Sequence, residues 1–152
     1  RIAAEAGVGI GTLYEYFPHK QALLLALAER HVELAEVEIH AACATQGTLR
    51  ELLTALQQAI LVSHRFPSQA LDLVQKEAGG PALRARAAML RQTVLQTLTA
   101  RAVHLSDPPL RAQVAFGAIG ELTARTLYEV EEPAVHARLA GYLLDMATAV
   151  LQ

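Results

Sequence analysis

Apolar residues recur every three to four positions along most of the chain, and the strict apolar–polar alternation of a strand is missing. A period near 3.6 residues is the signature of amphipathic helices, so the sequence predicts an all-α fold. Glycine, proline and capping residues divide the pattern into segments, and Thr48 with Glu51 forms a capping box. After a short N-terminal pair, the predicted helices cover residues 20–44, 48–64, 67–78, 81–103, 108–131 and 133–152.

Three of these helices carry more specific expectations. The segment Ser106–Pro109 is expected to cap the helix that follows it. In the helix of residues 20–44, the apolar side is predicted at Leu24, Leu27, Leu34 and Val37. In the helix of residues 81–103, the residues predicted to face inward are Leu83, Leu90, Val94 and Leu98.

The first residues predict two short helices joined by a tight turn. Residues 1–6 follow a helical pattern, Gly7 supplies the left-handed conformation that ends it, and Phe17-Pro18 ends the second helix. A helix, a glycine-containing turn and a short helix form the helix-turn-helix pattern. Leu13 and Phe17 are expected to bury one face of the short helix. The other faces carry Ile10, Gly11, Thr12, Tyr14 and Tyr16, a surface suited to contact with DNA.

These residues resemble the helix-turn-helix of the tetracycline-repressor (TetR) family of transcriptional regulators. The likeness rests on Ile2–Val8, Gly11–Tyr14, Tyr16-Phe17 and Lys20. It implies a helix-turn-helix DNA-binding domain at residues 1–28 and a helical ligand-binding and dimerisation domain at residues 29–152. It also implies a homodimeric repressor that leaves its double-stranded operator DNA when a small-molecule effector binds. The DNA contacts that the resemblance implies are Gly9, Ile10, Gly11, Thr12, Tyr14, Tyr16 and Lys20, with Tyr14 and Lys20 on phosphates.

The chain departs from the family pattern in two positions and at its start. Gly9 stands where Ser or Thr is common, and Ile10 stands where a polar or basic residue is frequent. The family has a further helix before the residue numbered 1, so we expect a preceding segment to complete the domain. Within residues 1–31 three basic residues balance three acidic ones. Because DNA binding needs local positive charge, we expect that segment to supply basic residues.

Composition narrows the alternatives. The chain of 152 residues is 53% hydrophobic with no apolar run of membrane-spanning length, which predicts a large core or a subunit interface and no membrane span. The single cysteine, Cys43, excludes an internal disulfide and fits a reducing, cytoplasmic compartment. No arrangement of catalytic residues can be recognised, so neither enzyme activity nor a cofactor is expected. The alternative function is a helical ligand-binding or interaction module that does not bind DNA.

One helical face allows a metal site as a minor alternative. Glu36, His40 and Cys43 follow each other at i, i+4 and i+7 in the helix of residues 20–44. A buried cysteine beside a solvated Glu–His pair is the simpler interpretation, and we predict no metal there.

The last two helices predict an interface between chains. The final helix carries two apolar stripes, one through Leu139 and Met146 and one through Leu144 and Leu151. A helix that is apolar on two faces must be buried on both, and two such helices from each of two chains make a four-helix bundle. The predicted interface residues are Gly117, Gly120, Ala124, Leu139, Leu143, Met146 and Val150.

A ligand pocket is predicted among the same helices and their neighbours. Apolar pockets with a few polar groups are the usual form of a small-molecule site. The candidate lining residues are His64, Phe66, Met89, Thr93, Phe116, Glu121, Arg125 and Tyr128, in which Glu121 and Arg125 form an i, i+4 pair.

Overall fold

All elements of the computed structural model are helices, which confirms the predicted fold class for the residues that the structure describes: 1–63, 74, 79–122 and 132–152. The helices are α1 (Ile2–Glu5), α2 (Ile10–Tyr16), α3 (Lys20–Cys43), α4 (Leu49–Ser63), α6 (Gly80–Arg101), α7 (Pro108–Gly117) and α9 (Pro133–Val150). A π-helical segment, η1 (Ala118–Leu122), continues α7. The predicted helix of residues 67–78 falls almost wholly outside the described residues.

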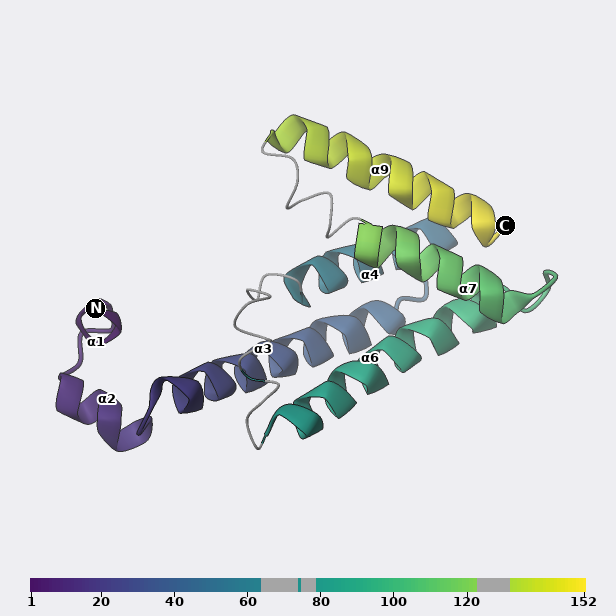
Figure 1. Cartoon of the computed structure of the whole chain (residues 1–152). Coiled ribbons are helices and arrows are strands. Elements are labelled where there is room, and N and C mark those ends of the chain that lie inside the picture. The colour runs from purple at the N-terminus through teal and green to yellow at the C-terminus, as the bar shows by residue number, and fades with distance from the viewer. Residues whose placement is uncertain (64–73, 75–78, 123–131) are drawn as a thin grey trace.

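The long helix α3 connects two parts of the molecule. Its C-terminal part packs against α4 and α6, and α9 covers α4, η1 and α7 on the other side (Figure 1). The short helices α1 and α2 contact each other and lie beyond the N-terminal end of α3, away from α7 and α9 (Figure 1). A change in the direction of α3 therefore moves α1 and α2 relative to the rest.

The main core lies between α3, α4, α6, α7 and α9. Leu52, Leu53 and Leu56 of α4 have no exposed surface, and they pack with residues of α6 such as Val94 and Leu98. Burial of one leucine side chain contributes about 1.5–3 kcal/mol to folding, so α4 lies at the centre of this core. The inward face predicted for α6 is confirmed, because Leu83, Leu90, Val94 and Leu98 are all buried.

The core face of α3 differs from the prediction. Leu27, Leu34 and Val37 are 53%, 45% and 67% exposed, whereas the buried residues are Ala28, Ala35, Ile39 and Ala42. Small residues on this face let the axes of α4 and α6 approach α3 closely. The larger leucines consequently point outward in the single chain.

Helix starts match the sequence prediction at one place and differ at another. The capping box at α4 is confirmed: the Glu51 carboxylate accepts from the Thr48 amide at 2.7 Å, and the Thr48 hydroxyl accepts from the Glu51 amide at 3.2 Å. At α7, Asp107 occupies the N-cap position with a left-handed backbone (φ 52°), but its side chain makes no capping bond. The prolines Pro108 and Pro109, whose φ is fixed near helical values, start that helix instead.

The predicted helix of residues 108–131 changes character at a glycine. The α-helix ends at Gly117, and the π-helical turn follows through the buried Gly120. Glycine lowers helix propensity, and single π-turns often interrupt α-helices at such points. No helix within the described ranges combines the length and the hydropathy that a membrane crossing requires.

Candidate functional site

The turn between α1 and α2 has the geometry that the glycine pattern predicts. Gly7 takes a left-handed conformation (φ 68°), which a side chain would strain. Directly after it, the Val8 amide donates to the Ala3 carbonyl at 3.0 Å and closes the turn back onto α1. Gly9 is the N-cap of α2 in an extended conformation, with no side chain to cap it. The turn therefore sets α2 at a fixed angle to α1.

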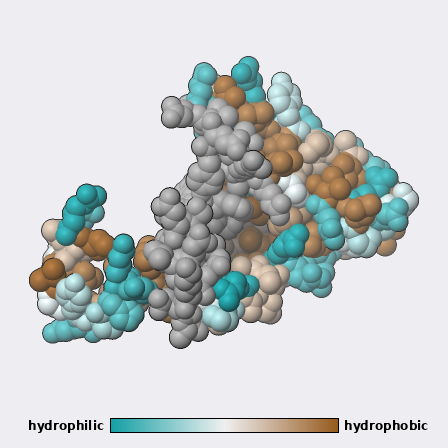
Figure 2. Space-filling model, in the orientation of Figure 1, coloured by the Kyte–Doolittle hydropathy of each residue, from teal (hydrophilic) through white to brown (hydrophobic). Residues whose placement is uncertain are grey.

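Helix α2 presents most of its side chains to solvent. Leu13 and Phe17 are half-buried, as expected for its inner face. On the outside, Ile10 is 67%, Tyr14 58% and Tyr16 75% exposed, and no atom lies within 4 Å of a Cβ built on Gly11. Apolar and polar residues alternate over this unit at the left of Figure 2. This is an outward surface of aromatic, apolar and hydroxyl groups with room for close approach at Gly11.

The start of α3 completes the surface. Phe17 leaves α2 in an extended conformation before Pro18, and His19 then caps α3 by accepting the Ala22 amide proton on Nδ1 at 3.1 Å. Lys20 is the first residue of α3, so its ammonium group stands at the positive end of that helix dipole. Sequence analysis missed His19, because histidine is a less common N-cap than Ser, Thr, Asp or Asn.

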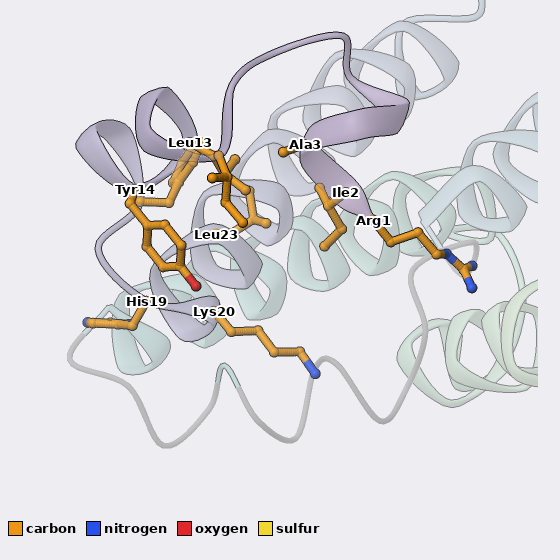
Figure 3. Close-up of a pocket in the computed structure, with 10 residues that line it drawn as sticks. Arg1, Ile2, Ala3, Leu13, Tyr14, His19, Lys20 and Leu23 are labelled. Carbon is orange, nitrogen blue, oxygen red and sulfur yellow. The ribbon is translucent and has the colours of Figure 1, made fainter.

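A hollow of about 340 Å³ lies between α1, α2 and the first turn of α3 (Figure 3). Its walls are mainly apolar and include Ile2, Leu13 and Leu23. Tyr14 and Lys20 also line it, so the two residues implied as phosphate contacts belong to one connected surface. These three elements thus line one apolar hollow.

Charges on this surface are few. Arg1 lies 3.5 Å from the Glu5 carboxylate in a fully solvated i, i+4 pair. Lys20 has no acidic partner among the described residues, so its charge is available to an anion. A helix N-terminus with a cationic side chain is a suitable place for a phosphate.

Residues 1–27 match the family profile described as bacterial regulatory proteins, tetR family. The N-terminal part of the chain is therefore similar to the TetR-family domain. No curated protein matches the chain by sequence. The match covers α1, α2 and the first turns of α3, where the turn geometry and the exposed α2 surface lie. This match supports the role of a DNA-binding transcriptional regulator.

All seven residues implied as DNA contacts in the TetR-family domain are solvent-exposed. Six of them belong to the turn and α2, and Lys20 begins α3. Their individual contacts with DNA remain predictions.

The residues predicted for a ligand pocket are placed only in part. Thr93 and Phe116 are half-buried, with the Arg91 guanidinium 5.4 Å from the centre of the Phe116 ring, while Met89 is 70% exposed. His64, Phe66, Arg125, Tyr128 and the side chain of Glu121 lie outside the described residues. A separate groove of about 620 Å³ between α6 and α7, lined by residues such as Gln96 and Pro109, includes none of the eight.

The residues predicted for the interface separate into exposed and internal ones. On α9, Leu139, Leu143 and Val150 are half-buried and Met146 is 41% exposed, whereas Leu144, Ala147 and Leu151 are buried in the chain's own core. Apolar residues also reach the surface over α9 and α7 in Figure 2. Gly117 has open space around it. Gly120 is buried against Ile60 of its own chain, and Ala124 lies outside the described residues.

Glu36, considered above as a metal ligand, is engaged in another way. Its carboxylate accepts two hydrogen bonds from the guanidinium of Arg86 on α6, and this contact holds the pKa of Glu36 below the usual carboxyl value. Among the described residues, no group of three metal-ligating side chains comes together.

Proposed function

We propose that this chain is a TetR-family regulator and a homodimeric repressor whose hold on operator DNA is weakened by a small-molecule effector. The DNA-binding part of the proposal rests on one surface: the exposed side of α2 next to the capped start of α3. Recognition helices place their N-terminal residues against base edges, which assigns Ile10, Gly11 and Thr12 to the major groove. Tyr14 and Lys20 would then bind flanking phosphates.

A homodimer is supported by the two faces of α9. One face is buried in the chain's own core through Leu144, Ala147 and Leu151. The other, which includes Tyr142 at 67% and Met146 at 41% exposure, carries large apolar side chains to the surface. Val114 of α7 and Leu122 of η1 are also exposed, each at 46%. Burial of such a surface against its symmetric copy would form a four-helix bundle.

Effector control is supported by the course of α3. The helix begins at the proposed phosphate contact and continues into the core beside α4 and α6. Two recognition helices in a dimer must be spaced by about 34 Å to read successive half-sites. A ligand that binds more tightly when α3 points in another direction changes that spacing. By thermodynamic linkage, the ligand then lowers the affinity for DNA by the factor by which it prefers that second direction of α3.

The decisive experiment is DNA binding by the full-length protein. Operator sequences are selected from a random duplex pool, and affinity is measured against salt concentration for wild type, Lys20→Ala and Tyr14→Phe. Lys20→Ala should weaken binding and reduce the salt slope by about one unit, because one phosphate contact is lost. Tyr14→Phe should weaken binding with an unchanged slope.

A matched control separates local contacts from net charge. Arg30→Ala removes one positive charge from an exposed pair with Glu33 on α3. This variant should bind like wild type. If wild type selects no sequence from the pool, the chain acts as a ligand-binding module without DNA binding, and the proposal fails.

A further inference from the structure

Helices α3 and α6 run side by side in the same direction and are joined at three levels (Figure 1). Near the start of α6, Gly79 packs on Leu25 so closely that a Cβ there would lie 2.9 Å from Leu25 Cδ2. At the far end, the Arg101 guanidinium donates to the Thr45 carbonyl at 2.9 Å and to the Gly47 carbonyl at 3.3 Å. Between these two contacts stands the pair of Glu36 and Arg86.

The middle contact is the directional one. Arg86 Nε donates to Glu36 Oε1 at 2.8 Å, and Arg86 Nη2 donates to Oε2 at 2.6 Å. Both side chains are partly shielded, with 28% of Glu36 and 35% of Arg86 exposed. Two parallel charge-assisted bonds fix the orientation as well as the distance of their partners. The ion pair therefore adds a directional constraint to the close packing of Leu25 on Gly79, and both contacts fix the register of α3 on α6.

Two further carboxylates share this face of α3. Glu29, Glu33 and Glu36 follow each other at i, i+4 and i+7. The pKa of Arg86 is raised mainly by its hydrogen bonds to Glu36, with smaller contributions from the charges of Glu33 and Glu29. Glu33 is held by Arg30 at 3.2 Å in a more exposed pair. It lies three residues closer to the DNA-binding end, or about 4.5 Å along the helix. Of these three carboxylates, Glu36 is the one that accepts hydrogen bonds from Arg86.

Glu36 lies far along α3 from Lys20. A small rotation of α3 at Glu36 therefore causes a large displacement at the DNA surface. Sixteen residues of helix separate Glu36 from Lys20, a lever of about 24 Å. A swing of α3 by about 10° around Glu36 displaces Lys20 by about 4 Å, and it also displaces Leu25 on Gly79 by about 3 Å. Hydrogen bonds to phosphate oxygens require distances near 3 Å, so such a displacement breaks them.

From this geometry we propose that Arg86 is a positioning residue for DNA recognition, which acts through Glu36 to hold α3, and with it α2, in the orientation that fits DNA. The consequence for DNA binding rests on the proposed function. The mechanical part, in which the ion pair orients α3, rests on the α3–α6 contact alone. Neither residue belongs to the DNA surface or to the predicted ligand pocket.

The mechanical part is tested by a distance measurement in the full-length protein. Spin labels are placed at Glu15→Cys on α2 and Ala88→Cys on α6, both exposed, after Cys43→Ser removes the native thiol. Labelled chains are diluted into unlabelled ones, and the distance distribution is measured by double electron–electron resonance. Arg86→Gln and Glu36→Gln should broaden the distribution or shift its mean by about 4 Å. The charge-exchanged double variant E36R/R86E should restore the wild-type distribution.

The consequence at DNA is measured on the same variants with the selected operator. E36Q and R86Q should lose about tenfold in affinity, the exchanged pair should regain it, and E33Q, a matched change one turn away, should bind like wild type. Thermal unfolding of each variant confirms that it is folded. R86K, which keeps the charge without the two parallel bonds, should fall between R86Q and wild type.

The two parts fail in distinguishable ways. Wild-type distance distributions in both E36Q and R86Q overturn the inference whatever the DNA affinities are. Shifted distributions with unchanged affinity overturn the role in DNA recognition. Absence of DNA binding by wild type refutes the proposed function, and the distance measurement still decides whether the ion pair positions α2.

Discussion

Leucine substitutions at Gly117 and Gly120 separate packing within the chain from packing between chains. The two glycines lie three residues apart at the junction of α7 and η1. A Cβ on Gly120 would lie 3.3 Å from Ile60 Cγ2 and 3.9 Å from Phe116 Cζ, so this position is already closely packed. A Cβ on Gly117 would have no atom within 4 Å in the single chain.

The expected magnitudes follow from this difference. Gly120→Leu inserts a large side chain into a filled core, which costs about 1–3 kcal/mol. For a domain of this size the unfolding temperature should fall by about 2–12 °C. Gly117→Leu meets no internal clash and improves helix propensity, so the isolated chain should keep its stability. At the proposed interface the same overpacking would raise the dimer dissociation constant about 5- to 150-fold.

Sedimentation equilibrium over a wide concentration range and thermal unfolding at several concentrations measure the two effects. The loss in Gly120→Leu should persist at every concentration, and any loss in Gly117→Leu should depend on concentration, as for a weakened dimer. Dimerisation of Gly117→Leu with the wild-type constant would refute the place of Gly117 in the interface. Wild-type stability of Gly120→Leu would refute the packing at Ile60, and a monomeric wild type would remove the homodimer.

Two further predictions concern folding stability. Thr48→Ala should lower the free energy of unfolding by about 1 kcal/mol, measured by urea denaturation, because the capping hydroxyl of α4 is lost; an unchanged midpoint would contradict the capping role. The pKa of Glu36 is lower in the folded chain than the usual value of about 4.3. Its carboxylate therefore stabilises the fold above that pH, and this contribution to stability disappears as the pH falls through the folded-state pKa. Stability measured from neutral to acid pH should therefore depend less on pH in E36Q than in wild type, and equal pH dependences would show that the pair does not act in this way.

The sequence predicted those features that local chemistry determines. The capping box of α4 and the left-handed Gly7 require only neighbouring residues, and both are present. The inward face of α6 was predictable because its large apolar residues share one stripe. On α3 the same argument was wrong for Leu27, Leu34 and Val37. Three of the four buried residues there are alanines, which carry little apolar signal while they decide how closely helices pack.

Contacts between distant residues could not be predicted in this way. Glu36 and Arg86 are fifty residues apart, and each looks like an ordinary solvated charge in its own helix. The turn geometry and the exposed surface of α2 were predictable because helix, turn and helix are contiguous and the glycine spacing is specific. The predicted pocket and interface draw on several helices, so their residues depend on packing that periodicity does not specify.

Helix α3 connects the DNA-binding part to the main body. It packs against both α4 and α6, with Ala28, Ala35, Ile39 and Ala42 buried, and the ion pair of Glu36 and Arg86 adds a directional contact to α6. Under the proposed function, an effector that alters the packing of α6 on α3 would change the direction of α3. In a dimer, that change would alter the spacing of the two recognition helices.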